Sequence, residues 1–167
     1  SNKSSSAEHG ENLVASKFKL LFDRGTQPPG SPVLNFGIPR ALNMYENFPF
    51  WCSFLVECGF GVVLSDTSGN ELFEKGSGSV MSDNICFPAK LAHGHVINLI
   101  EKGVDRIFYP TVVYENREFR NAVNNFNCPV VTGYPDVLKS SIDPEGKHGI
   151  PMDSPVVSFK DTDLLKK

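Results

Sequence analysis

The fold is decided by residues 32–66, which read PVLNFGIPRALNMYENFPFWCSFLVECGFGVVLSD. Two short apolar runs, at residues 33–37 and 61–64, flank a longer helical pattern at residues 41–58. Gly59 follows that pattern at the left-handed cap position that glycine favours after a helix. This order of strand, helix and strand predicts the start of a parallel sheet covered by helices.

The same alternation continues along the chain. Gly103, like Gly59, follows a helical stretch and precedes a strand. The expected elements are a helix at residues 71–75, a helix at about 88–102, a strand at 106–109, a helix around 118–125, a strand at 130–132 and a short helix from about Pro135. Such alternation is typical of a three-layer α/β domain, whose mostly parallel sheet carries helices on both faces in a Rossmann-like or flavodoxin-like arrangement.

The composition argues against several classes of partner. Lys and Arg number 16 against 19 Asp and Glu, and no basic run is present, so a nucleic-acid surface is not expected. No apolar stretch approaches the roughly 20 residues of a membrane-spanning helix, and no signal-peptide pattern is seen, which predicts a cytoplasmic protein. The cysteines form no Cys-x-x-Cys pair, so neither a zinc module nor a dense set of disulfides is indicated.

Glycine, proline and serine content divides the chain into three parts. Residues 1–31 are rich in Ser, Gly and Asn around one amphipathic island at 13–22, and we interpret them as a linker or the edge of an excised domain. The α/β domain is expected over residues 32–142. Residues 143–167 contain several Pro and Gly, and they are expected to form a loop-rich tail leading towards a further domain.

In a doubly wound sheet, ligands bind beyond the carboxyl ends of the strands. Three loops share that edge, at residues 37–40, 65–68 and 109–111. Arg40 opens a helix after a strand, where it either holds an anionic ligand or pairs with a surface carboxylate. The hydroxyl-rich loop 65–68 suits phosphate, but it suits an ordinary helix cap better.

The densest group of reactive side chains lies at residues 82–95, SDNICFPAKLAHGH. Polar residues and Pro88 mark the start of a helix there. One side of this helix carries Lys90 and His93 one turn apart, with Cys86 on the same side just before the first turn. The buried face is expected to consist of Ala89, Ala92, Val96 and Leu99.

Cys86 is the best chemical candidate in the chain. A thiol at a helix N-terminus beside a cation is favoured as the thiolate, which binds metals or attacks electrophiles. The alternative is that Cys86 packs inertly, as many cysteines do. His93 and His95 point in nearly opposite directions from a regular helix, so no zinc pair is expected. We expect both histidines to hydrogen-bond in the core, with Gly94 allowing another element to approach closely.

The other cysteines carry weaker signals. Cys52 and Cys58 lie on different faces of an aromatic-rich helix and are expected in the core. Cys128 stands at the start of the strand predicted around residues 130–132, which places it near the opposite edge of the sheet from Cys86. Cys86 and Cys128 remain the two candidate metal ligands.

Several motifs in order resemble one protein family. They are GIPRALNMYEN at residues 37–47, PFW at 49–51, CFPAKLAHGH at 86–95, IFYP at 107–110 and NCPVV at 127–131. Together they resemble the uncharacterised domain of CoA-substrate-specific enzyme activases, large bacterial proteins described as activators of 2-hydroxyglutaryl-CoA dehydratase. The resemblance covers most of residues 32–142.

The resemblance implies a place within a larger protein. In that family the domain follows tandem ATPase modules, and it is similar to the α/β subunit domains of 2-hydroxyacyl-CoA dehydratases. This chain has no ATPase phosphate motif, so we expect it to be an excised middle domain without turnover of its own. The expected partners are the ATPase and dehydratase-like domains of the parent protein and an enzyme of the acyl-CoA dehydratase type.

The related dehydratases bind a 4Fe-4S cluster through cysteines. By similarity, Cys86 matches a first ligand, with Lys90 and His93 tuning its charge and hydrogen bonding. A second ligand is expected where this chain has Thr111, and Thr binds iron poorly compared with a thiolate. The resemblance implies cluster binding and ATP-driven, low-potential electron transfer, with the cluster complete only in the full-length protein.

Two other functions stay open. A domain that has lost its cluster would be a scaffold between the ATPase and dehydratase-like parts, and Thr111 in place of Cys agrees with this. A phosphate- or CoA-binding module would use Arg40 and the loop 65–68. The electron-transfer role predicts a cavity beside Cys86 and Thr111, whereas the scaffold predicts an exposed apolar patch at that edge.

Overall fold

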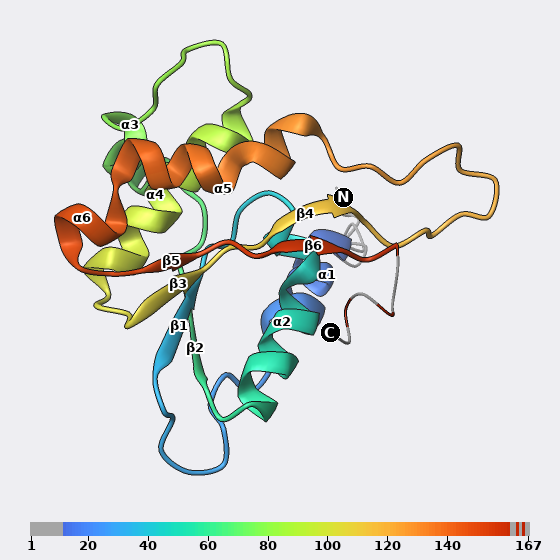
Figure 1. Ribbon diagram of the computed structural model, residues 1–167, viewed down its shortest axis with the longest axis horizontal. Coiled ribbons are helices and arrows are strands. Elements are labelled where there is room, and N and C mark those ends of the chain that lie inside the picture. The colour runs from blue at the N-terminus through green and yellow to red at the C-terminus, as the bar shows by residue number, and fades with distance from the viewer. Residues whose placement is uncertain (1–11, 161–162, 164, 166–167) are drawn as a thin grey trace, which may run out of the picture.

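The computed structural model describes residues 12–160, 163 and 165, and it is built around a four-stranded sheet. Its strands are β1 (Asn35–Ile38), β2 (Gly61–Leu64), β3 (Arg106–Phe108) and β5 (Met152–Asp153). They follow the order β2-β1-β3-β5, and every neighbouring pair is parallel. Gly37 of β1 lies opposite Val63 on one side and Ile107 on the other, so β1 is an inner strand. The expected α/β fold is confirmed (Figure 1).

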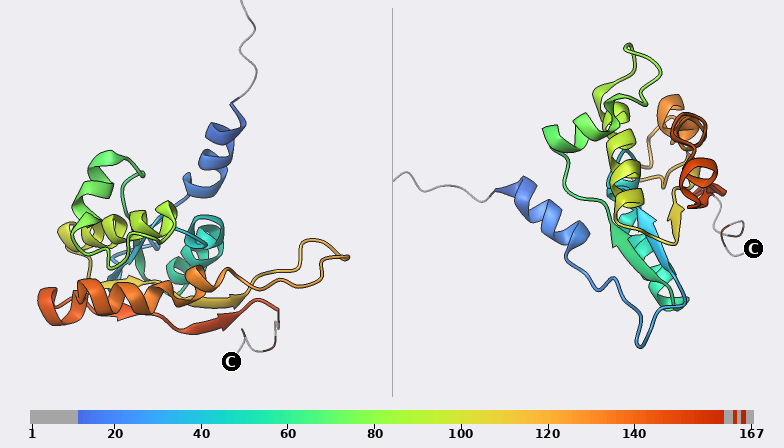
Figure 2. Two further views of the ribbon diagram at one scale, coloured as in Figure 1. Left: turned by 90° about the horizontal axis from the view of Figure 1, so that it is seen from above. Right: turned by 90° about the vertical axis from the view of Figure 1, so that its left-hand side faces the viewer.

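Helices cover both faces of this sheet (Figures 1 and 2). One face carries α3 (Asn70–Ser77), α4 (Phe87–Glu101) and α5 (Pro129–Ile142), and the other carries α2 (Met44–Glu57). The helix α1 (Leu13–Phe22) packs against α2, and α6 (Pro144–His148) follows α5. Within the described part of the chain, no helix is long and apolar enough to cross a membrane.

Two further strands prolong the sheet. β4 (Thr111–Tyr114) and β6 (Val156–Ser158) pair in parallel and continue β3 and β5. Backbone hydrogen bonds join the two pairs, from Tyr109 N to Asp153 O at 2.8 Å and from Thr111 N to Pro155 O at 2.9 Å. The Arg106 guanidinium also donates a hydrogen bond to each carboxylate oxygen of Asp153, both at 2.8 Å. The chain leaves β4 towards the start of α5.

The helices α3 and α4 meet backbone to backbone at two glycines. A Cβ atom on Gly94 would overlap the carbonyl oxygen of Leu72, and one on Gly76 would overlap the backbone nitrogen of Gly94. The close approach expected at Gly94 is therefore confirmed, and its partner is α3. The expected buried face of α4 is confirmed as well, because Ala89, Ala92, Val96 and Leu99 are all fully buried.

The helix predicted around residues 118–125 is wrong. This stretch belongs to an extended excursion between β4 and α5 that projects away from the sheet (Figure 1). A bridge between Tyr114 and Phe126 closes its base, together with a bond of 2.9 Å from Glu115 N to Asn125 O. Residues 116–121 are exposed, so a helix there would have no apolar face to bury.

The strand predicted at residues 130–132 is also wrong, because α5 begins at Pro129 and runs unbroken to Ile142. Tyr134, Leu138 and Ile142 are buried at four-residue spacing, which is helical periodicity. Packing of this face outweighs the strand preference of the β-branched residues at the start of the helix. Pro135 lies inside the helix and does not end it.

Both ends of the described chain contribute more helices, strands and buried side chains than expected. The tail after Ile142, predicted to be loop-rich, contains α6, β5 and β6, and its Met152 and Phe159 are buried. At the other end, Phe22 of α1 packs on Phe48 with ring centres 5.2 Å apart. The first 11 residues of the segment predicted to be a linker lie outside the described part of the chain.

We expect Gly94→Ala to lower the free energy of unfolding by about 3 kcal/mol, because the new methyl group forces α3 and α4 apart. Urea denaturation followed by circular dichroism measures this change. Gly133→Ala in α5 is the matched control, since a Cβ there meets nothing within 4 Å. Ala has the higher helix propensity, so the control should gain up to about 1 kcal/mol. Equal stability of both variants would contradict the packing described for α3 and α4.

Candidate functional site

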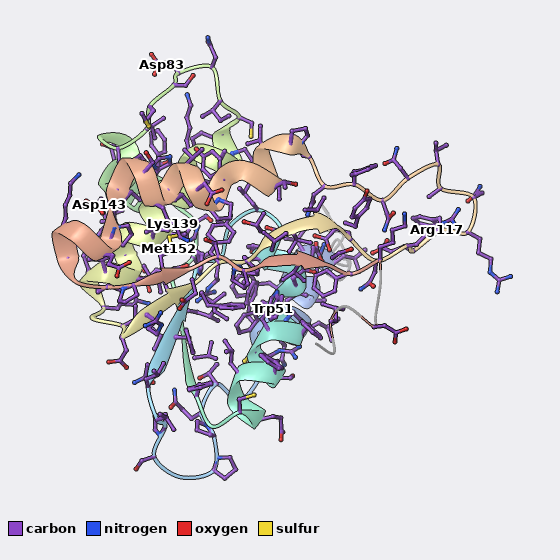
Figure 3. All side chains as sticks on the ribbon, in the orientation of Figure 1. Trp51, Asp83, Arg117, Lys139, Asp143 and Met152 are labelled. Carbon is purple, nitrogen blue, oxygen red and sulfur yellow. The ribbon has the colours of Figure 1, made fainter. Side chains whose placement is uncertain are left out.

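A cavity of about 490 Å³ lies between α4, α5 and the loop that joins α3 to α4. The loop, with Asp83 labelled at its tip in Figure 3, passes over the side of α5. Both helices begin at the carboxyl edge of the sheet, where α/β proteins bind ligands. The residues lining the cavity include Val80, Met81, Ile85, His93, Val130, Tyr134 and Val137.

Cys86 and Cys128 each adjoin, in the sequence, a residue that lines this cavity, and we call this position its rim. Each is the residue just before a helix, Cys86 before α4 and Cys128 before α5, and both side chains are exposed. Their sequence neighbours Ile85 and Pro129 both line the cavity. The expectation that Cys128 lies at the opposite edge from Cys86 is therefore wrong, because the segment after Cys128 is a helix and not a strand.

The two cysteines occupy the same position relative to their helices. Neither α4 nor α5 has a side chain that caps its first turn, and the carbonyl of each cysteine accepts from the helix, that of Cys86 from Lys90 N at 3.2 Å and that of Cys128 from Thr132 N at 3.0 Å. The positive end of a helix dipole stabilises negative charge placed there. Within the described residues, no group of three or more His, Cys, Asp or Glu side chains is arranged to hold a metal ion.

The remaining cysteines lie away from this rim. Cys52 is buried in α2, as expected, and its sulfur lies 3.5 Å from the carbonyl oxygen of Gly25. Burial raises the pKa of the Cys52 thiol. Cys58 is exposed at the C-terminal end of α2, so its predicted place in the core is wrong. A helix C-terminus presents carbonyl groups, which do not favour an anionic sulfur.

His93 sits on the cavity wall at the centre of a hydrogen-bond chain. The Ser79 oxygen lies 2.9 Å from the carbonyl oxygen of Gly76 and 2.8 Å from His93 Nδ1. The other ring nitrogen, Nε2, lies 3.0 Å from the Tyr134 hydroxyl, and the tautomer of the ring decides which of these two groups donates. In either tautomer the Tyr134 hydroxyl keeps hydrogen-bonding capacity that His93 does not use.

The charges of this pair follow from burial. Desolvation lowers the pKa of His93, so the ring stays neutral near pH 7. Burial raises the pKa of Tyr134, and the nearby Cys86 raises it further because two negative charges would repel. The effect of Cys86 on Tyr134 places this cysteine within electrostatic reach of the cavity wall.

Lys90 and Thr111, the other two residues that the resemblance singled out near Cys86, lie in different parts of the structure. The Lys90 ammonium donates to the carbonyl oxygen of Asp83 at 2.8 Å and so ties the loop to α4. Thr111 begins β4, and it is absent from the residues that line the cavity. Next to it, Tyr109 is fully buried, and its hydroxyl has no hydrogen-bond partner among the described residues. Burial raises the pKa of Tyr109.

Arg40 is held by aromatic rings. Its guanidinium carbon lies 5.5 Å from the ring centre of Phe18 and 5.1 Å from that of Phe22, both in α1. Such cation–π contacts stabilise the charge without an anion. Desolvation lowers the pKa of Arg40, and no hydrogen-bond acceptor for its Nε is present among the described residues.

His95 is the centre of a second buried group of hydrogen bonds at the same edge of the sheet. Its Nδ1 lies 2.7 Å from Ser65 Oγ and its Nε2 lies 3.0 Å from Ser68 Oγ. The backbone N–H of Arg40 donates to the same Ser65 oxygen at 2.8 Å. Burial lowers the pKa of His95 to about 4, and the positive charge of Arg40 contributes to this. The histidine therefore joins the loops after β1 and β2 to α4.

Asp66, in the same loop, is bound to the last part of α4. Its carboxylate accepts from Asn98 Nδ2 at 2.8 Å and from the Lys102 ammonium at 2.7 Å. Hydrogen bonds from these two side chains lower the pKa of Asp66. The loop is thus anchored to α4 through the side chains of Ser65, Asp66 and Ser68.

Sequence reasoning brought Cys86, Lys90 and His93 together but missed Tyr134 and Ser79. A signal for Tyr134 was present, because Tyr134, Leu138 and Ile142 have helical spacing. Ser79 has no such signal, since only the packing of α3 on α4 brings it to His93.

A family model described as the CoA enzyme activase uncharacterised domain matches residues 35–167 of the chain. The match includes β1 and the residues of the cavity, with both cysteines at its rim. No curated protein and no solved structure is similar enough to count as a match.

The burial of His95 predicts a loss of stability in mild acid. Its pKa is about 4 in the folded protein against an ordinary value of 6.5, so the unfolded chain binds the proton more readily. The contribution of neutral His95 to the free energy of unfolding is therefore complete above about pH 6.5 and is lost as the pH falls towards 4. Urea denaturation should give about 2 kcal/mol less stability at pH 5 than at pH 7 from this residue alone.

The comparison between variants isolates this effect. His95→Gln should shrink the difference between pH 7 and pH 5 by about 2 kcal/mol, whatever its own cost at pH 7. His148→Gln, at an exposed residue of α6, is the control and should leave the difference unchanged. An unaltered pH dependence in His95→Gln would show that the ring does not titrate as its burial requires.

Proposed function

We propose, on the premise that the chain belongs to the CoA enzyme activase family, that Cys86 and Cys128 supply two ligands of an iron–sulfur cluster. One observation supports this most: both cysteines are exposed, and each precedes a helix at the rim of the same cavity. Cysteine thiolates are the usual ligands of such clusters. The cluster would lie at the carboxyl edge of the sheet, where α/β folds bind their ligands.

Two cysteine ligands in this chain suit a cluster whose other ligands come from outside it. A cluster commonly takes four cysteine ligands, and no group of three or more metal-binding side chains is present among the described residues. The remaining ligands would come from another domain, another subunit or a small thiol. Thr111 is a poor candidate for a ligand, because its hydroxyl binds iron weakly and it does not line the cavity.

Several groups of the chain would hold the two cysteines in place. The bond from Lys90 to Asp83 fastens the loop that leads into Cys86. The hydrogen bonds from Ser79 to His93 and from His93 to Tyr134 connect the start of that loop to α5, the helix that Cys128 precedes. The N–H groups at the starts of α4 and α5 would offset part of the negative charge of the thiolates. A bound cluster supplies the chemistry of accepting and releasing single electrons at low potential.

In this proposal the domain is an electron carrier within a larger assembly. ATP hydrolysis would take place in other domains, and the electron would pass towards a partner enzyme that acts on an acyl-CoA substrate. The proposal that Arg40 binds phosphate or CoA has less support, because its guanidinium already lies over Phe18 and Phe22. A scaffold without a cluster is the alternative that the following experiment separates.

We expect anaerobic reconstitution with iron, sulfide and dithiothreitol to give the visible absorbance and, after reduction, the paramagnetic resonance signal of an iron–sulfur cluster. Dithiothreitol can supply thiolates in place of the ligands that other parts of the assembly would provide. Cys86→Ala and Cys128→Ala should each lower the bound iron at least about ten-fold, because each removes one of only two protein ligands. Absorbance, iron content and spin quantification measure the loss.

Cys58→Ala is the matched control, because Cys58 is exposed but lies at the C-terminal end of α2. It should retain the full signal. A signal that persists in the variant lacking both Cys86 and Cys128 would contradict the assignment of the ligands. Failure of the unmodified chain to bind iron, both alone and within a longer protein that contains it, would favour the scaffold.

A further inference from the structure

We propose that the cavity between α4, α5 and the loop 78–86 binds a small uncharged molecule with an apolar body and one hydroxyl group, which forms a hydrogen bond with Tyr134. The proposal concerns the protein without iron. It therefore stands or falls separately from the ligand role of Cys86 and Cys128.

The cavity has the size and the lining of a small-molecule site. Its volume of about 490 Å³ falls within the range of roughly 300–1,000 Å³ that is usual for such sites. Aliphatic side chains form most of the lining, from the loop on one side and from α5 on the other. They are Val80, Met81, Ile85, Val130 and Val137.

The lining excludes a charged occupant. No Asp, Glu, Lys or Arg is among the described residues that line the cavity. His93 is the only titratable base among them, and burial keeps it neutral near pH 7. A carboxylate or phosphate placed inside would lose its hydration and gain no opposite charge, which is costly. The phosphate groups of a nucleotide or of CoA would have to remain outside.

The Tyr134 hydroxyl gives the cavity a polar group with hydrogen-bonding capacity to spare. Its oxygen lies 3.0 Å from His93 Nε2, and His93 Nδ1 lies 2.8 Å from the Ser79 hydroxyl. Whichever way these protons run, one hydrogen-bonding position of the Tyr134 hydroxyl stays unused by His93: a lone pair in one tautomer of the ring, the phenolic proton in the other. An O–H group on the occupant fits both cases, because a hydroxyl both donates and accepts.

Depth separates a small molecule from a docked protein segment. Tyr134 is only 3% exposed, whereas Met81 at the mouth is 74% exposed. A helix or strand lying across the opening would contact the loop and miss the hydroxyl of Tyr134. The flexible thioether side chain of Met81 can adjust to different apolar shapes at the entrance.

Three probes of one shape test the chemistry: 2-naphthol, 2-naphthoate and naphthalene. Binding to the iron-free chain is followed by titration with detection by nuclear magnetic resonance of the methyl groups of Val80, Val130 and Val137. We expect 2-naphthol to bind about ten-fold or more tightly than 2-naphthoate, because the carboxylate has no partner in the cavity. It should bind about five-fold more tightly than naphthalene, because naphthalene has no group that can hydrogen-bond to Tyr134.

Two variants locate the site. Gly133→Leu places a side chain in the cavity, where the new Cβ meets nothing within 4 Å, and leucine favours the helix more than glycine does. This variant should fold and lose binding of 2-naphthol at least about ten-fold. Tyr134→Phe should lower the affinity for 2-naphthol about five-fold and leave that for naphthalene unchanged. Ser140→Leu, at an exposed residue of the same helix, is the control and should bind as the parent does.

Each other result overturns the proposal. Equal affinity for 2-naphthol and 2-naphthoate would refute the exclusion of charge. Unchanged binding in a folded Gly133→Leu variant would place the ligand elsewhere, and the absence of saturable binding of all three probes would remove the site altogether. Iron binding at Cys86 and Cys128 is measured separately, so none of these results bears on the cluster.

Discussion

The backbone contact between Gly76 and Gly94 is the constraint on which the layer of α3 and α4 depends. With no side chain on either glycine, α3 approaches α4 until the carbonyl of Leu72 borders Gly94. This closeness brings Ser79, just beyond the end of α3, to within 2.8 Å of His93. A methyl group at either glycine would separate the helices and break the serine–histidine bond at the same time. Packing and the polar chain at the cavity are thus one feature of the molecule.

The two histidines that flank Gly94 serve different surroundings from one helix. His95 reaches Ser65 and Ser68 in the loop after β2, and His93 reaches Tyr134 in α5. Residues two apart on a helix point in nearly opposite directions, so α4 joins the loops at the sheet edge to the wall of the cavity. Both rings are neutral near pH 7 because burial lowers the pKa of each. Neither histidine needs a metal ion to satisfy its nitrogens.

The parallel topology gathers the chemistry at one edge. The starts of α4 and α5 come together, because Ile85, just before α4, and Pro129, the first residue of α5, line the same cavity. Cys86 and Cys128, 42 positions apart in the sequence, meet the same cavity for this reason. Both cysteines lie within residues 35–167, which match the CoA enzyme activase uncharacterised domain. The cluster ligands and the small-molecule site that we propose are neighbours, but their donors are different groups.

The sequence by itself determined the elements whose pattern is local. The apolar periodicity of α4, the glycine caps at Gly59 and Gly103, and the alternation of strands and helices all follow from spacing within a single element. Gly94 likewise indicated that another element of the fold lies close to it, because a glycine in a buried helix leaves room for one. Tertiary structure alone decided that α3 is this neighbour, that residues 130–132 are helical, and that the tail completes the sheet. The physical reason is that a segment with mixed local preferences adopts the conformation that buries its apolar face against elements distant in sequence.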